Sequence, residues 1–341
     1  MGNFTKVKSG PCKINFLYNL ANDSYSAIFP VYIFDTFRGI NNILYLIYTN
    51  INMSIILYDI IHNQKINEIK KAHCKYITGF RHYTDKSNQK DYIMSISWED
   101  NNLKIWNLSN LECLLNLKNI NFYTKNVSAC FLSDKEQIYI ATCIGCSYDY
   151  YNKDYIKIFD LKGNLKKIIN NSNLYDTVFI DNFYDNELSN NYIMTSNITF
   201  SISYDYNHNK IHHTYRDKEN VDKQYNRLVV YKDEDLTKLI ESCGDGFIRI
   251  WNFHLGTLLK KINCKQPLNC ICLWDNKYAF VGCSNKTIKL VDLNSEKTIK
   301  NLKGHNNSVL FIQIINHSKY GECLVSQGFE NDQIKLWLIK N

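Results

Sequence analysis

Two clusters in this sequence contain residue types that bind metal ions. The first is Cys143-Ile-Gly-Cys146, in which two thiols have the C-x-x-C spacing used by zinc sites. A structural zinc site needs a second Cys pair or His residues at finger-like spacing, and none follows. Because the pair falls where a strand is expected to end, we favour thiols packed as small hydrophobic side chains.

His208, His212 and His213 form the second cluster, within a stretch rich in Asn, Asp and Tyr. That composition argues against a helix, on which His208 and His212 would share a face. In a strand, His212 and His213 point to opposite faces and cannot easily bind one ion. Neither cluster predicts a metal or a cofactor, and we expect the protein to have none.

Motifs for catalysis are missing from the sequence. It has no G-x-S-x-G nucleophile elbow, no Walker loop, no dinucleotide-binding glycine fingerprint and no H-E-x-x-H. We therefore do not expect an enzyme. Catalytic carboxylates or His residues drawn from separate repeats would leave no motif, and they would instead converge in the fold.

Length and composition bound the class of protein. The chain has 341 residues, 45% of them hydrophobic, and its 17 Phe and 25 Tyr favour strands. No apolar stretch approaches the ~20 residues of a membrane span. Twelve Cys are scattered along a chain without a secretion signal, so we expect reduced thiols and an intracellular protein, cytoplasmic or nuclear. A partial myristoylation signal at Met1-Gly2 makes N-terminal lipid anchoring a weaker expectation.

A six-residue motif recurs seven times along the sequence, and it predicts the strands that would position any functional site. Most copies alternate apolar and polar residues and end on a large side chain followed by Asp or Asn, which is the pattern of a half-buried strand. The repeat distance is 40 to 53 residues, a period typical of propeller blades or arrays. The copies lie at residues 54–59, 102–107, 155–160, 200–205, 247–252, 287–292 and 333–338.

Each repeat reads as four strands, so the sequence predicts an all-β, seven-bladed propeller that forms one domain over residues 1–341. The last repeat ends after its third strand. We expect residues 3–8 to supply the missing outer strand of that blade, which closes the ring and removes an open sheet edge. The expected blades are residues 9–73, 74–121, 122–171, 172–218, 219–265, 266–304 and 305–341.

The repeat resembles the WD-repeat β-propeller family over nearly the whole chain. That family marks blades with Gly-His before the first strand, an Asp before the third and Trp-Asp at the end of the third. Gly304-His305 and Ala72-His73 match the first mark, and Asp100 and Asp245 lie six residues before Trp106 and Trp251. Asn331 has the same offset from Trp337. Blade four, around residues 200–205, is the most degenerate.

The resemblance implies a hydrogen-bond network inside some blades, with a structural rather than catalytic role. Its members would be His73, Asp100 and Trp106 in blade two, Asp245 and Trp251 in blade five, and His305, Asn331 and Trp337 in blade seven. The resemblance also implies a binding platform. We expect a non-catalytic protein–protein interaction scaffold that binds peptides or proteins within a larger complex.

Specificity is expected from loops and from surface charge. The loop at residues 145–154 carries Tyr148, Tyr150 and Tyr151, amphipathic rings of the kind enriched at binding hot spots. Lysines concentrate on the outer strands, where they protect sheet edges or form a basic rim for anionic lipid or nucleic acid, which is the alternative function. These are Lys65, Lys70, Lys71, Lys118, Lys166, Lys167, Lys260, Lys261, Lys265, Lys297, Lys300 and Lys303.

Overall fold

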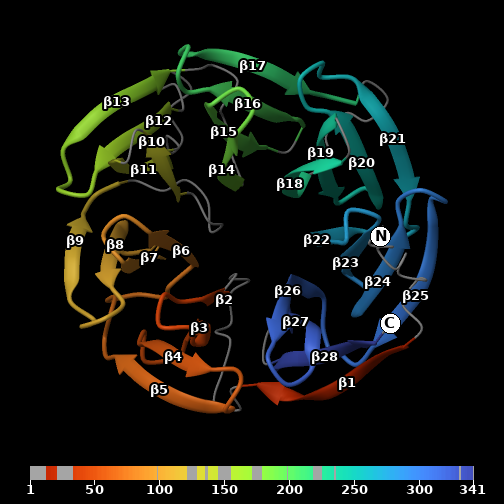
Figure 1. The fold of residues 1–341 in the computed structure, drawn as a ribbon, viewed down its shortest axis with the longest axis horizontal. Coiled ribbons are helices and arrows are strands. Elements are labelled where there is room, and N and C mark those ends of the chain that lie inside the picture. Colours follow the sequence, from red (N-terminus) through yellow and green to blue (C-terminus); the bar gives the residue numbers. More distant parts are fainter. Residues whose placement is uncertain are drawn as a thin grey trace, which may run out of the picture.

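The chain folds into a ring of seven four-stranded antiparallel sheets (Figure 1). A computed structural model describes residues 13–20, 34–97, 99–120, 129–134, 137–144, 155–170, 179–197, 199–217, 225–233, 236–329 and 332–340. These residues contain strands and no helix, and therefore no helix long and apolar enough to cross a membrane. The predicted all-β, seven-bladed propeller is confirmed.

The first three blades of the ring follow one another along the chain, each running from an innermost to an outermost strand. Blade one has β2 (Phe34–Arg38), β3 (Leu44–Thr49), β4 (Ile55–Asp59) and β5 (Gln64–Ile69); blade two has β6 (Gly79–Asp85), β7 (Lys90–Ser97), β8 (Asn102–Asn107) and β9 (Cys113–Leu117); blade three has β10 (Ala129–Asp134), β11 (Gln137–Ile144), β12 (Tyr155–Asp160) and β13 (Leu165–Asn170).

The remaining four blades keep this order, except that the last takes its outer strand from the start of the chain. Blade four has β14 (Phe179–Asp185), β15 (Asn190–Ser196), β16 (Ser201–Asp205) and β17 (Lys210–Tyr215); blade five has β18 (Tyr225–Asp233), β19 (Leu236–Cys243), β20 (Phe247–Asn252) and β21 (Leu258–Asn263); blade six has β22 (Leu268–Trp274), β23 (Tyr278–Cys283), β24 (Thr287–Asp292) and β25 (Lys297–Lys303); blade seven has β26 (Val309–His317), β27 (Gly321–Gly328), β28 (Ile334–Lys340) and β1 (Lys13–Leu20).

Alternation along the third strand lets each blade pack against both neighbours. On β8, Leu103 and Ile105 are buried in a cluster shared with blade three. Trp106, on the opposite face, is buried in a cluster shared with blade one. The core is therefore a series of apolar layers between adjacent blades, and the inner ends of the blades converge on the ring axis.

The ring is closed by β1, which pairs antiparallel with β28 from Lys13↔Lys340 to Leu20↔Ile334. Figure 1 shows β1, from the N-terminal part of the chain, beside β28 from the C-terminal part. Ile14 and Leu20 are buried while Lys13 and Phe16 are exposed. Closure by an N-terminal strand was predicted, and it leaves the outer edge of β28 paired.

The residues assigned to this closing strand were wrong. The strand is Lys13–Leu20 rather than residues 3–8, which lie outside the described residues, and it belongs to blade seven rather than to a first blade that begins at residue 9. The sequence places Gly10-Pro11 between the two segments. We expected this turn signal to follow the closing strand, whereas in the sequence it precedes β1.

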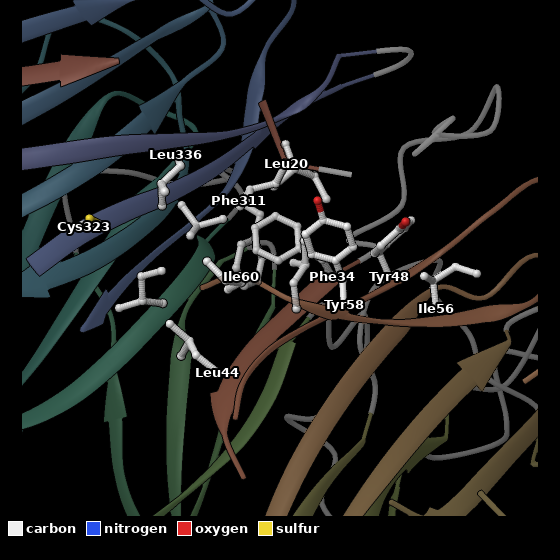
Figure 2. Close-up of a cluster of buried hydrophobic side chains, with 14 residues drawn as sticks. Leu20, Phe34, Leu44, Tyr48, Ile56, Tyr58, Ile60, Phe311, Cys323 and Leu336 are labelled. Atoms are coloured by element: carbon white, nitrogen blue, oxygen red, sulfur yellow. The ribbon is translucent and has the colours of Figure 1, made fainter. Parts of the chain in front are cut away.

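An apolar cluster joins the first and last blades beside the closing strand (Figure 2). Phe34 of β2 and Phe311 of β26 meet edge to face with ring centroids 4.1 Å apart. Leu20 of β1 is fully buried in the same cluster. Strand pairing and side-chain packing thus both fasten the two ends of the ring.

Candidate functional site

In blade two, one serine connects the predicted network. Trp106 Nε1 donates to Ser95 Oγ at 2.8 Å, and Ser95 Oγ lies 2.8 Å from His73 Nε2. His73 Nδ1 lies 3.2 Å from Asp100 Oδ2. Burial lowers the pKa of His73, so its ring is neutral at pH 7. Because a carboxylate only accepts, Nδ1 carries the proton and Nε2 accepts from the Ser95 hydroxyl.

Blade seven repeats this arrangement with a different acid. His305 Nε2 lies 2.7 Å from Ser326 Oγ, which also accepts from Trp337 Nε1 at 2.7 Å. His305 Nδ1 lies 2.8 Å from Asp332 Oδ2. Asn331, the residue predicted for this position, lies outside the described residues. The turn before this third strand places the acid five residues before the Trp, one fewer than in blade two. The six-residue offset therefore selected the wrong side chain.

In blade five the two predicted network residues, Trp251 and Asp245, bind different partners. Trp251 Nε1 donates to Glu241 Oε2 at 2.8 Å, so a carboxylate replaces the serine. Asp245 instead pairs with Arg249, whose Nη2 lies 2.6 Å from Oδ2. Arg249 Nε also donates to Asp217 Oδ2 at 2.9 Å. A buried ion-pair cluster therefore stabilises this blade. The sequence feature that could have revealed it is an acid and a base at paired positions of two apolar strands, Glu241 opposite Arg249.

Glu241 is fully buried, and burial raises its pKa to about 7 in spite of the nearby Arg249. In blades two and seven the equivalent positions, Ser95 and Ser326, face Lys104 and Lys335 in the same strand register. All three blades therefore pair a small or acidic residue on the second strand with a base on the third. These polar groups serve the interior of each blade.

The histidine cluster is also structural. His208 Nδ1 lies 2.9 Å from Asp205 Oδ2 within one turn. The His212 ring packs 4.4 Å from His213 and 5.6 Å from His254, between blades four and five. Within the described residues no three His, Cys, Asp or Glu side chains form a group that could hold a metal ion. Cys143 is buried, and its partner Cys146 lies outside the described residues.

Tyr148, Tyr150 and Tyr151, the predicted interaction loop, also lie outside the described residues. Several rim lysines are engaged by the protein itself. Lys167 donates to the backbone oxygen of Tyr206 at 3.0 Å, and Lys260 donates to that of Leu293 at 2.9 Å. Both bonds join neighbouring blades, so these side chains act as inter-blade links.

A set of residues around the ring axis was not predicted from the sequence. In blade two, Trp106 pairs with Ile93, and the next residue, Met94, pairs with Arg81 on the innermost strand. In each of the other blades, the same two steps of strand pairing lead from the position equivalent to Trp106 to one residue on the innermost strand. These seven residues, which we call the axial ring, are Asp35, Arg81, Cys130, Asp181, Val229, Cys272 and Gln313. All but Cys130 are partly exposed, so solvent reaches the axis.

The axial ring combines charges of both signs from blades that are far apart in sequence. Burial raises the pKa of Asp35 to about 6, with Asp181 adding to the rise and Arg81 and Arg227 opposing it. Burial also raises the pKa of the Cys130 and Cys272 thiols, which makes them poor nucleophiles at neutral pH. The ring therefore offers charged and hydrogen-bonding groups without an activated nucleophile.

Comparison with known proteins gives partial matches. No family model matches the chain. A WD repeat domain-containing protein 83 homolog from Dictyostelium discoideum is 30% identical over 101 residues, which is 29% of this chain and 30% of that protein. Myosin heavy chain kinase C from the same organism is 25% identical over 83 residues, 24% of this chain and 10% of that protein. The chain thus spans less than a third of the length of either relative.

Proposed function

Because the chain is a divergent WD-repeat β-propeller, we propose that it is a non-catalytic scaffold that binds peptide or protein partners within a larger complex. The observation that carries this proposal is the closed ring with a partly exposed polar axis, to which all seven blades contribute one residue. A ring held by strand pairing and inter-blade packing is rigid before binding, so a partner is bound at little cost in ordering entropy.

Chemistry at the axis supports binding rather than catalysis. The axial ring includes two carboxylates, Asp35 and Asp181, but none of its seven members is a His. Its two thiols are protonated at neutral pH, because burial raises the pKa of both. An acid–base pair with an activated nucleophile is what a hydrolase would need.

The alternative function, a basic rim that binds anionic lipid or nucleic acid, is favoured by the net charge of +7. Against it, several rim lysines already bind acidic groups of the protein. Lys65 pairs with Glu68 at 2.6 Å, Lys166 with Asp160 at 3.1 Å and Lys261 with Asp217 at 2.8 Å. These pairs reduce the charge that the rim presents, so we rank the alternative second.

Affinity capture of the tagged protein from its own cells tests the proposal. Bound proteins would be identified by mass spectrometry after washing at low and at high salt. We expect a stoichiometric set of proteins that survives high salt. Recovery of only lipid or nucleic acid, lost as salt rises, would favour the basic rim instead.

We also propose an intracellular location, cytoplasmic or nuclear. The ten cysteines in the described part of the chain are free thiols, as expected in a reducing compartment. Fluorescence microscopy of the tagged chain in its own cells tests this, and secretion into the medium would contradict it.

A further inference from the structure

Two arginines reach across the ring axis. Arg81, on β6 of blade two, donates from Nη2 to the backbone oxygen of Ile180 in blade four at 3.3 Å, and its Cζ lies 5.6 Å from the Phe179 ring centroid. Arg227, on β18 of blade five, has its Cζ 4.5 Å from the Phe311 centroid in blade seven. Neither pair of blades is adjacent in the ring. Both guanidinium groups therefore lie in its centre.

One aromatic ring is shared by the two cations. Phe179 has the Cζ of Arg81 at 5.6 Å and the Cζ of Arg227 at 5.8 Å from its centroid. Burial lowers the pKa of Arg227, and the like charge of Arg81 lowers it further, so the two guanidinium groups repel each other. Two like charges held close together favour a counter-charge between them.

Most donors of these two groups have no acceptor in the part of the chain that is described. The Arg227 guanidinium donates no hydrogen bond there, and the buried Arg81 Nε has no partner. The two bonds that Arg81 does make, to the backbone oxygens of Phe80 and Ile180, are each 3.3 Å long. Charge-assisted hydrogen bonds are ordinarily about 2.7–2.9 Å.

Two carboxylates near the axis do not satisfy these donors. Asp35 and Asp181 act on Arg227 through their charge, yet no ion pair joins either of them to Arg81 or Arg227 among the described residues. Asp35 accepts from the backbone nitrogen of Thr36, and Asp181 from that of Asn182. They limit the net positive charge at the axis, which favours a group with one negative charge, such as a carboxylate, over a group that concentrates two, such as phosphate.

We propose that the ring axis binds one carboxylate group, held between the guanidinium groups of Arg81 and Arg227. A guanidinium fork matches the two oxygens of a carboxylate, and the rings of Phe179 and Phe311 lie beside the guanidinium groups of Arg81 and Arg227. The carboxylate belongs to a side chain or C-terminus of a partner peptide, a point that rests on the proposed scaffold function. A free small carboxylate is the other source of the same chemistry.

The test uses the full chain with anions of defined type at constant ionic strength. Glutarate, inorganic phosphate and chloride would be compared by their effect on Tm. A fluorescent Gly/Ser hexapeptide that ends in Asp with a free C-terminus would be compared with its Asn, C-terminally amidated counterpart by polarisation. The variants are Arg81→Gln and Arg227→Gln, with Arg38→Gln, an exposed arginine at the end of innermost strand β2, as the matched control.

Glutarate, or the acidic peptide, is expected to bind the wild type and Arg38→Gln, with about a tenfold or greater loss of affinity in Arg81→Gln and Arg227→Gln. Peptide binding points to a partner as the source, whereas a response to glutarate alone points to a free carboxylate. Without anion, Arg227→Gln is expected to keep or raise Tm, because it removes a charge that repels Arg81. Equal anion responses in all four proteins, a preference for phosphate, or no response in the wild type would each overturn the proposal.

This result is separable from that of the scaffold proposal. If Arg227→Gln captures the same salt-resistant proteins from cells as the wild type does and also binds glutarate as the wild type does, the axial site is wrong and the scaffold stands. If the wild type captures none but binds glutarate through Arg227, the scaffold is wrong and the axial site stands.

Discussion

Trp251 donates its indole hydrogen to Glu241, where blades two and seven place the hydroxyl of a serine. The geometry of the indole bond is conserved across the three blades, at 2.8, 2.8 and 2.7 Å, although the acceptor differs. A titratable group has therefore replaced a neutral one inside the core of blade five. This substitution makes the stability of the propeller depend on pH.

Glu241 is expected to destabilise the fold as pH rises. Its folded-state pKa of about 7 exceeds the ordinary value of 4.5 for a glutamate, so between these values the folded state holds a proton that the unfolded state has released. The free energy of unfolding should fall by up to about 3 kcal/mol from pH 4.5 to pH 7 because of this group. Urea unfolding of Glu241→Gln should show a weaker pH dependence and greater stability at pH 8.

Glu322→Gln is the matched control for that experiment. Glu322 accepts from Trp274 Nε1 at 3.1 Å but is partly exposed. Its substitution should leave the pH dependence unchanged. A wild type and Glu241→Gln with parallel stability curves from pH 5 to pH 8 would contradict our interpretation of Glu241.

Removal of the connecting serine should destabilise blade seven. Ser326→Ala leaves His305 Nε2 and Trp337 Nε1, both buried, without their partner. We expect a loss of about 2–4 kcal/mol in the free energy of unfolding, measured with urea. Ser109→Ala, at an exposed turn where the hydroxyl bonds to the side chain of nearby Asn107, should change it by less than about 0.5 kcal/mol. Similar losses in the two variants would argue against a structural role for the network.

Closure of the ring can be tested by one leucine on β1. Leu20 is fully buried between the first and last blades, so Leu20→Ala should cost about 2–5 kcal/mol. Leu255→Ala, the same change at a side chain that is 66% exposed, should have little effect. Thermal unfolding compares the two. An unchanged Tm in Leu20→Ala would mean that β1 contributes no stability.

Carboxylate binding at the axis should strengthen as pH falls. An anion between Arg81 and Arg227 would raise the pKa of Asp35 above its value of about 6, so binding takes up a proton. Among the described residues, Asp181 is the other charged group that acts on Asp35 and Arg227. Affinity for glutarate is expected to rise from pH 8 to pH 5.5 and to lose this dependence in Asp35→Asn. An affinity that is the same at both pH values would exclude the coupling.

The recurring six-residue motif was enough to predict the propeller, because the alternation of apolar and polar residues and a regular repeat distance can both be seen directly in a sequence. It also identified His73, Asp100 and Trp106, which the structure joins through Ser95. Ser95 itself was not predicted, since a serine within a strand carries no distinctive signal. Asn331 was chosen over Asp332 because the offset assumed equal turn lengths.

The axial ring could not be predicted from the same pattern. Its members come from seven blades, and their residue types share no motif that one blade would reveal. Arg81 and Arg227 are 146 residues apart in the sequence, and only the closed ring brings them to one centre. Register between strands, rather than sequence spacing, decides which side chains meet there.

The pairing of β1 with β28 also orders events during synthesis. Among the described strands β1 is synthesised first, and it cannot pair until β28 has left the ribosome. At about 5–20 residues per second this wait is on the order of tens of seconds, during which Ile14 and Leu20 have no completed blade to enter. Nascent chains are therefore most exposed to misassociation at their leading end, where a chaperone would have the longest time to act.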